Sequence, residues 1–152
     1  MIPVAAPVDP REVQSLQAYL NQYTQQAEVY SRQLGLMEEG IREANASIET
    51  LNALAEAGEA PVFMPIGSGL NIRATIVQPD EVFVSIGSDI IVQKTNAGAI
   101  SYLQDRIKEM EATAKNLTEV LQKIDAQVKD IQKRLEQLYR QAQAEQQGTG
   151  SS

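Results

Sequence analysis

The stretch APVFMPIGSGLNIRATIVQPDEVFVSIGSDIIVQKT, Ala60 to Thr95, decides the fold because it is the only part of the chain that indicates β-structure. It holds four short apolar-rich runs, at 62–66, 70–77, 82–86 and 90–95, and the second and third show the two-residue period of a half-buried strand. The Gly-containing turns within each pair predict two β-hairpins. We expect the four strands to form one open sheet, and the free edges of such a sheet to be completed by other chains in an oligomeric β-barrel.

We call residues 60–95 the β-body. Its apolar side chains are the expected assembly residues. They are Val62, Phe63, Ile66, Leu70, Ile72, Ile76, Val82, Val84, Ile86, Ile90 and Val92.

Long segments on both sides of the β-body carry apolar residues at alternating spacings of three and four, which is typical of a coiled coil. The first seam is Val13, Leu16, Leu20, Tyr23, Ala27, Tyr30, Leu34, Met37, Ile41, Ala44, Ile48, Leu51 and Ala55. The second is Ile100, Leu103, Ile107, Met110, Ala114, Leu117, Leu121, Ile124, Val128, Ile131, Leu135, Leu138 and Ala142. Gly35 and Gly40 fall off the first seam.

Because the two seams are equally long, they predict an antiparallel hairpin in which Leu20 lies near Leu135 and Ala55 near Ile100. The predicted fold class is therefore α+β: a long antiparallel α-helical coiled-coil hairpin with two central β-hairpins that join an oligomeric β-barrel. Both chain ends lie at one end of this hairpin, which we call the tip: residues 8–23 and 135–142.

Turn and cap signals divide the chain into five parts. Residues 1–10 are a flexible lead-in with three prolines, 11–58 the first helix, 59–95 the two β-hairpins, 96–145 the second helix and 146–152 a disordered tail. Asp9 is the expected N-cap of the first helix, with Pro10 in its first position. Thr95 or Asn96 is the expected cap of the second.

Composition excludes several functions. The chain has no histidine and no cysteine, so it cannot build a His-based catalytic triad or a zinc site of those ligands; we expect no enzyme, no metal and no cofactor. The net charge is -7 and no Lys/Arg-rich run occurs, which argues against nucleic-acid binding. No apolar stretch is long enough to cross a membrane, and no secretory signal opens the chain. We expect a cytoplasmic protein.

Three segments resemble signatures of the archaeal-type prefoldin alpha subunits: Pro65-Ile66-Gly67-Ser68-Gly69, Val84 to Val92, and Ala99 to Ile107. Asp89 departs from the pattern, since a glycine is frequent there in the family. Two β-hairpins, rather than one, are similar to the alpha class.

The resemblance implies a molecular chaperone that works without ATP. It implies a hexamer of two alpha-type and four beta-type subunits, which captures unfolded polypeptides, prevents their aggregation and delivers them to a group II chaperonin in the cytoplasm. The alternative is a prefoldin-like scaffold or filament-forming oligomer built from the same β-body.

Client binding is expected at the tip, where apolar side chains lie near a chain end that nothing caps. The candidates are Val4, Val8, Val13, Leu16, Tyr19, Leu20, Tyr23, Leu135, Leu138 and Tyr139. Most of these lie on the seam, so they serve equally well as coiled-coil core. Tyr19 and Tyr139 lie off the seam and could contact a client without opening it.

Overall fold

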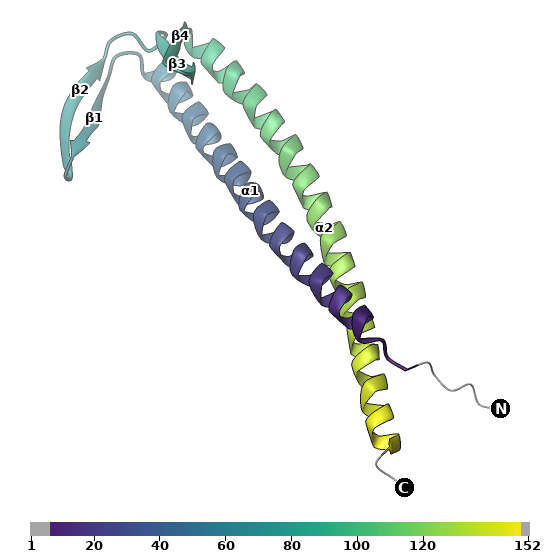
Figure 1. The fold of residues 1–152 in the computed structure, drawn as a ribbon. Helices are drawn as coiled ribbons and strands as arrows, with labels where there is room; N and C mark the ends of the chain where they lie inside the picture. The colour runs from purple at the N-terminus through teal and green to yellow at the C-terminus, as the bar shows by residue number, and fades with distance from the viewer. Residues whose placement is uncertain (1–6, 150–152) are drawn as a thin grey trace. The chain divides into compact units, whose positions relative to one another are not determined.

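The computed structural model describes residues 7–149 (Figure 1). The elements follow in the order α1 (Pro10–Ala57), β1 (Ala60–Gly67), β2 (Leu70–Ile76), β3 (Val82–Gly87), β4 (Ile90–Lys94) and α2 (Asn96–Thr149). The described chain divides into two compact units, one of residues 7–35 with 115–149 and one of residues 36–114, and each is taken by itself below. Neither long helix in the described chain is apolar enough to cross a membrane.

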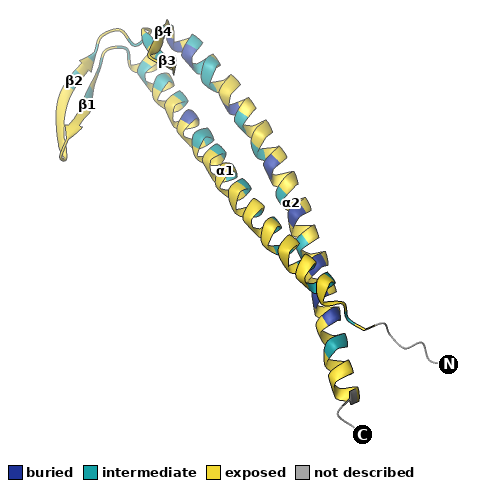
Figure 2. Ribbon diagram, viewed as in Figure 1, coloured by how far each residue is buried: buried dark blue, intermediate teal, exposed yellow. Residues whose placement is uncertain are grey.

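In the first unit, the start of α1 packs on the end of α2, and the two helices run in opposite directions (Figure 1). Gln17 contacts Tyr139 and Glu12 contacts Arg134 across this pair. The seam is confirmed there. Every predicted seam residue of this unit is buried or half-buried, whereas most of the intervening residues are exposed (Figure 2). The buried members are Leu117, Ile124, Ile131, Leu135 and Leu138.

Helix α1 begins as expected. Asp9 caps it, because its carboxylate accepts a hydrogen bond from the Arg11 amide at 2.9 Å and its carbonyl one from the Glu12 amide at 3.1 Å. Helix α2 extends further than expected, and residues 146–149, assigned to the flexible tail, belong to it. Its last turns are rich in Gln, Ala and Glu, which favour helix, so the helix persists until Gly148 and Thr149.

In the second unit, the four strands form two separate two-stranded antiparallel sheets, β1–β2 and β3–β4, not the single open sheet expected from the sequence. The segment between β2 and β3 contains Pro79, and Asp80 bonds to the start of α2. Both features direct this loop to the helix instead of into a third hairpin. The fold class is confirmed: two long helices flank two small β-hairpins.

Both hairpins close through two-residue turns with left-handed backbone. The φ angles are 50° at Ser68 and 79° at Gly69 in the first turn, and 30° at Ser88 and 65° at Asp89 in the second. These values are typical of type I′ turns, whose twist matches that of paired strands. Glycine adopts the left-handed backbone of position 89 with the least strain, but Asp tolerates this region better than most other residues.

A buried asparagine joins three segments where α2 begins. Asn96 is only 6% exposed, and its backbone amide donates to Asp80 Oδ1 at 3.0 Å. Its side-chain Nδ2 donates to the carbonyl of Leu51 on α1 at 2.9 Å and to the carbonyl of Pro79 at 3.3 Å. Thr95 is the cap, since its Oγ1 accepts from the Gly98 amide at 3.0 Å. Asp80 therefore acts as a second cap, supplied from a loop distant in sequence.

Two seam assignments in this unit are wrong. Ala55 is exposed and Leu54 is half-buried in its place. The last inward residues of α1 therefore follow at steps of three, Ile48, Leu51 and Leu54, where the heptad pattern predicted a final step of four. Gly40, assigned off the seam, faces α2 closely, because a Cβ at Gly40 would lie 2.7 Å from Met110 Sδ.

Candidate functional site

The tip places its candidate client-binding residues at three levels of exposure. Leu135 and Leu138 are buried, and Leu138 is only 2% exposed. Tyr19 and Tyr139 are 54% and 48% exposed. The remaining described candidates are half-buried, namely Val8, Val13, Leu16, Leu20 and Tyr23, while Val4 lies outside the described residues.

Two polar contacts cross between the helices at the tip. Gln17 Nε2 donates to the Tyr139 hydroxyl at 2.8 Å. Arg134 Nε donates to Glu12 Oε1 at 2.9 Å, an ion pair whose side chains are about half exposed. Leu135 and Leu138 lie within one turn of Arg134 and Tyr139 along α2, so the polar contacts accompany the most deeply buried part of the seam.

A groove of about 600 Å³ opens at the tip between the start of α1, with Val8 just before it, and the end of α2. It is lined by Val8, Pro10, Val13, Gln14, Leu138, Tyr139, Ala142, Glu145 and Gln146. The Tyr139 ring also lines a smaller hollow on α2 that includes Leu135 and Arg140. Tyr139 therefore offers an aromatic ring to two adjacent depressions, with its hydroxyl held by Gln17.

Hairpin β1–β2 presents an apolar face on which Met64 is 50% and Ile72 47% exposed, while Val62 and Ala74 are half-buried. The register pairs Met64 with Ile72 and Val62 with Ala74, so these four side chains share one face. The opposite face carries Phe63, which is 71% exposed, with the Arg73 guanidinium 5.8 Å from its ring centroid. A hairpin with a partly exposed apolar face and two unpaired edges is expected to add to another sheet.

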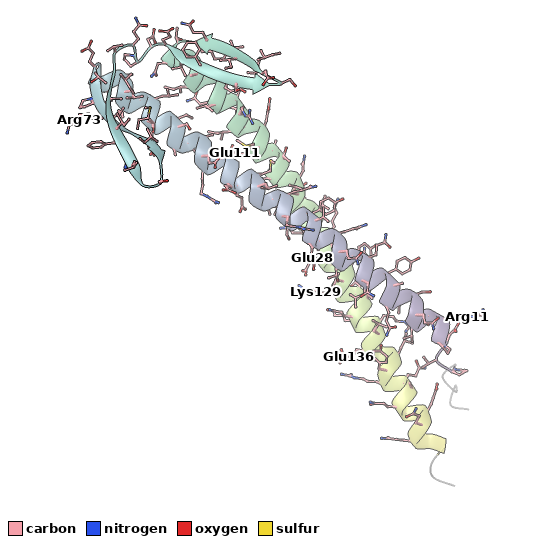
Figure 3. All side chains as sticks on the ribbon, turned by 60° about the vertical axis from the view of Figure 1, so that its left-hand side comes forward. Arg11, Glu28, Arg73, Glu111, Lys129 and Glu136 are labelled. Carbon is pink, nitrogen blue, oxygen red and sulfur yellow. The ribbon has the colours of Figure 1, made fainter. Side chains whose placement is uncertain are left out.

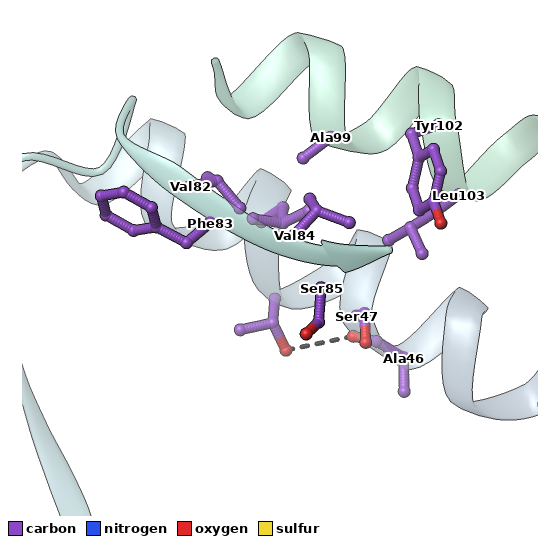
Figure 4. Close-up of a pocket in the computed structure, with 11 residues that line it drawn as sticks. Ala46, Ser47, Val82, Phe83, Val84, Ser85, Ala99, Tyr102 and Leu103 are labelled. Atoms are coloured by element: carbon purple, nitrogen blue, oxygen red, sulfur yellow. Dashed lines mark hydrogen bonds between the residues drawn. The ribbon is translucent and has the colours of Figure 1, made fainter. Parts of the chain in front are cut away.

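Hairpin β3–β4 has an inner and an outer face. Val82, Val84 and Val92 are half-buried, while Phe83 and Ile91 of the other face are exposed. Val84 lines a groove of about 490 Å³ together with Leu51 of α1 and Leu103 of α2 (Figure 4). Val82 and Val84 thus pack partly against their own helices, whereas Phe83 and Ile91 are free to meet another chain.

The remaining predicted assembly residues follow the same division. Phe63, Ile66, Leu70, Ile72, Ile86 and Ile90 are largely exposed, and Val62 and Ile76 are half-buried. Four further exposed apolar residues were missed by the sequence reasoning: Met64, Val77, Phe83 and Ile91. The sequence did contain a signal, since Met64 lies in the predicted strand 62–66 and Ile91 in the predicted strand 90–95. Only the strand register shows which face of the hairpin each side chain occupies.

Charged residues lie on the exposed sides of the helices, among them Glu28 of α1 and Lys129 and Glu136 of α2 (Figure 3). Lys129 pairs with Asp125 at 2.9 Å, and Arg140 pairs with Glu136 at 2.6 Å, both one turn apart. Such exposed pairs contribute little stability and keep the surface solvated. Within residues 7–149, no group of three or more acidic, histidine or cysteine side chains is placed to hold a metal ion.

Comparison with known proteins agrees with this architecture. The family model described as "Prefoldin subunit" matches residues 12–141. The chain is 95% identical over 148 residues to a "Prefoldin subunit alpha" of Methanospirillum hungatei JF-1, covering 97% of this chain and 99% of that protein. It is 50% identical to one of Methanoregula boonei, covering 89% and 88%.

A solved structure has the same fold. It is titled "Cryo-EM structure of filamentous PFD from Methanocaldococcus jannaschii", and it superposes with a TM-score of 0.66 at 25% identity, covering 76% of this chain and 96% of that one.

Prefoldin subunits are chaperones, not enzymes. The chain belongs to the prefoldin family, as an alpha subunit.

Proposed function

We propose that this chain is the alpha subunit of an ATP-independent holdase that captures unfolded polypeptides with its tips and prevents their aggregation. The observation that carries the proposal is the exposure of two aromatic rings at the tip, Tyr19 at 54% and Tyr139 at 48%, of which Tyr139 lines a largely apolar groove. Aromatic rings supply a large apolar contact area for little loss of side-chain freedom. Unfolded chains expose the apolar segments that such rings bind.

The β-body supports the proposed assembly. Phe63, Leu70, Ile72 and Ile91 would be exposed to water in a lone chain, and their burial against other subunits is the expected source of assembly free energy. We propose a cytoplasmic hexamer of two alpha-type and four beta-type subunits, which delivers its clients to a group II chaperonin.

A double substitution tests the tip. Tyr19→Ala with Tyr139→Ala should weaken binding of an unfolded model protein, reduced and carboxymethylated α-lactalbumin, by about tenfold, because two exposed aromatic contacts are removed. Fluorescence anisotropy of the labelled client measures the dissociation constant. Leu36→Ala is the matched control, since Leu36 is an exposed apolar residue outside the tip. Equal affinity of the double variant and this control would contradict the tip assignment.

The second candidate is a structural oligomer or filament, which the likeness to a filamentous prefoldin favours. Native mass of the chain alone and with a beta-type partner separates the two. A discrete hexamer formed only with the partner supports the holdase, whereas long polymers in both samples support the filament.

A further inference from the structure

The two β-hairpins are internal repeats of one another. Residues 62–73 are VFMPIGSGLNIR and residues 82–93 are VFVSIGSDIIVQ, so Val, Phe, Ile, Gly and Ser recur at matched positions twenty residues apart. The strand pairing repeats as well, because both registers shift at the residue just before the turn glycine, Gly67 in one hairpin and Gly87 in the other. Each residue of the first hairpin therefore has a structural counterpart in the second.

Met64 and Val84 are such counterparts, since Met64 lies opposite Ile72 and Val84 lies opposite Val92. Val84 is half-buried in the groove that β3 forms with the two helices. Met64 is 50% exposed, and Ile72 opposite it is 47% exposed. The same position of the repeat thus holds a half-buried valine in one hairpin and an exposed methionine in the other.

Met64 is also the most exposed of the three methionines within residues 7–149. Met37 and Met110 are half-buried, and Met110 packs so close to Gly40 that a Cβ there would lie 2.7 Å from its sulfur. The chain has no cysteine, so methionines hold all of its sulfur atoms. Because oxidation of sulfur follows its exposure, Met64 should react before Met37 and Met110.

We propose that Met64 is a site of reversible oxidation by peroxides, and that its sulfoxide opposes assembly of the chain. A lone pair of the thioether sulfur attacks one peroxide oxygen, the O–O bond breaks and an S–O bond forms. Sulfur loses two electrons, and hydrogen peroxide is reduced to water. The lone chain is the form that reacts, because assembly would cover the sulfur.

The inference rests on the proposed function, because it needs the face that Met64 shares with Ile72 to be buried against another subunit. A sulfoxide is polar and accepts hydrogen bonds, so its burial without a donor is costly. Arg73 is the one charged residue of this hairpin, and it lies on the opposite face with its guanidinium 5.8 Å from the Phe63 ring. The aliphatic face around Met64 therefore offers the sulfoxide no side-chain donor.

Peptide mass spectrometry after brief treatment of the lone chain with hydrogen peroxide tests the site. Met64 should be oxidised at least about fivefold faster than Met37 or Met110, because its sulfur is the most accessible. Equal rates at the three residues would overturn the proposal.

Native mass spectrometry over a concentration series tests the effect on assembly. The treated chain, freed of peroxide, is mixed with an untreated beta-type prefoldin subunit and should assemble about tenfold more weakly than the untreated chain. Met64→Gln places an uncharged polar group at the same position, and it should weaken assembly by a similar factor without peroxide.

Met64→Val is the matched control, because it copies the Val84 of the sister hairpin and leaves Met37 and Met110 in place. Peroxide should leave its assembly unchanged. Met64→Leu provides the same comparison with a longer side chain, so the test does not depend on one variant folding. A loss of assembly in both variants after peroxide would assign the effect to another methionine and overturn the proposal.

Methionine sulfoxide reductases A and B with dithiothreitol test reversibility. The sulfoxide oxygen leaves as water while the dithiol is oxidised to a disulfide, and assembly should return to the untreated level. Continued weak assembly after mass spectrometry shows the restored thioether would overturn the proposal. Equal assembly of treated and untreated chains would overturn the oxidation site alone, whereas no assembly of the untreated chain would overturn the proposed function together with it.

Discussion

At the scale of single residues, Asn96 and Asp80 contribute most that the sequence pattern did not predict. The sequence indicated a cap near Thr95 and Asn96, and Thr95 fills that role. It did not indicate that the Asn96 side chain bonds to α1, or that Asp80 accepts a hydrogen bond from the Asn96 backbone amide. Contacts between residues 16 and 45 positions apart leave no periodic trace in one sequence, so only coordinates reveal them.

Asn96→Asp should destabilise the chain by about 1–3 kcal/mol, because the new carboxylate cannot donate to the Leu51 and Pro79 carbonyls and lies close to Asp80. Chemical denaturation followed by circular dichroism measures the loss. Asn52→Asp is the matched control, as Asn52 is exposed on α1. Equal denaturation midpoints for the two variants would contradict a structural role for the side-chain amide of Asn96.

At the scale of elements, the sequence predicted the helices and hairpins well and their local partners less well. Heptad spacing located the seam because both helices bury the same stripe along most of their length. It failed at Ala55, in the last turn of α1, where Leu54 is half-buried instead. The strand pattern likewise located β1 to β4, but it does not show whether β2 and β3 pair across the Pro79 loop, and in the structure they do not.

The two glycines within α1 should respond differently to alanine. Gly35 has open space around its missing Cβ, so Gly35→Ala should stabilise the helix by about 0.5–1 kcal/mol. Gly40→Ala should gain less, because the new Cβ displaces the Met110 thioether from its position 2.7 Å away. Thermal unfolding of both variants in the same assembly measures the difference, and an equal gain for both would contradict the close approach at Gly40.

At the scale of the whole molecule, charge and apolar surface are distributed unevenly. Residues 36–114 carry twelve acidic and five basic side chains, while the rest of the chain carries eight of each, so the net charge of -7 belongs to the unit that contains the β-body. That unit also exposes most of the large apolar side chains. Acidic charge around apolar assembly surfaces favours solubility of the lone chain before it meets its partners.

Phe63 and Val84 were both predicted to be assembly residues, but their substitution should have different effects. Phe63 is 71% exposed, so Phe63→Asp should leave the fold of the lone chain unchanged and weaken assembly with a beta-type partner. Val84 packs in the groove formed with Leu51 and Leu103, so Val84→Asp should also lower the melting temperature of the lone chain. Circular dichroism and native mass measure the two effects, and a stable lone Val84→Asp chain would contradict this assignment.

The hydrogen bond from Asn96 to Leu51 also has a consequence for the order of folding. It closes a loop of 45 residues, whereas the Gln17–Tyr139 contact closes one of 122. Loop-closure entropy grows with the logarithm of length, so forming the longer loop first costs about 0.9 kcal/mol more. The helices should therefore zip outward from the β-body, so that Asn96→Asp mainly slows folding and Gln17→Ala mainly speeds unfolding. The last contacts to form would then be those that hold the start of α1 on the end of α2.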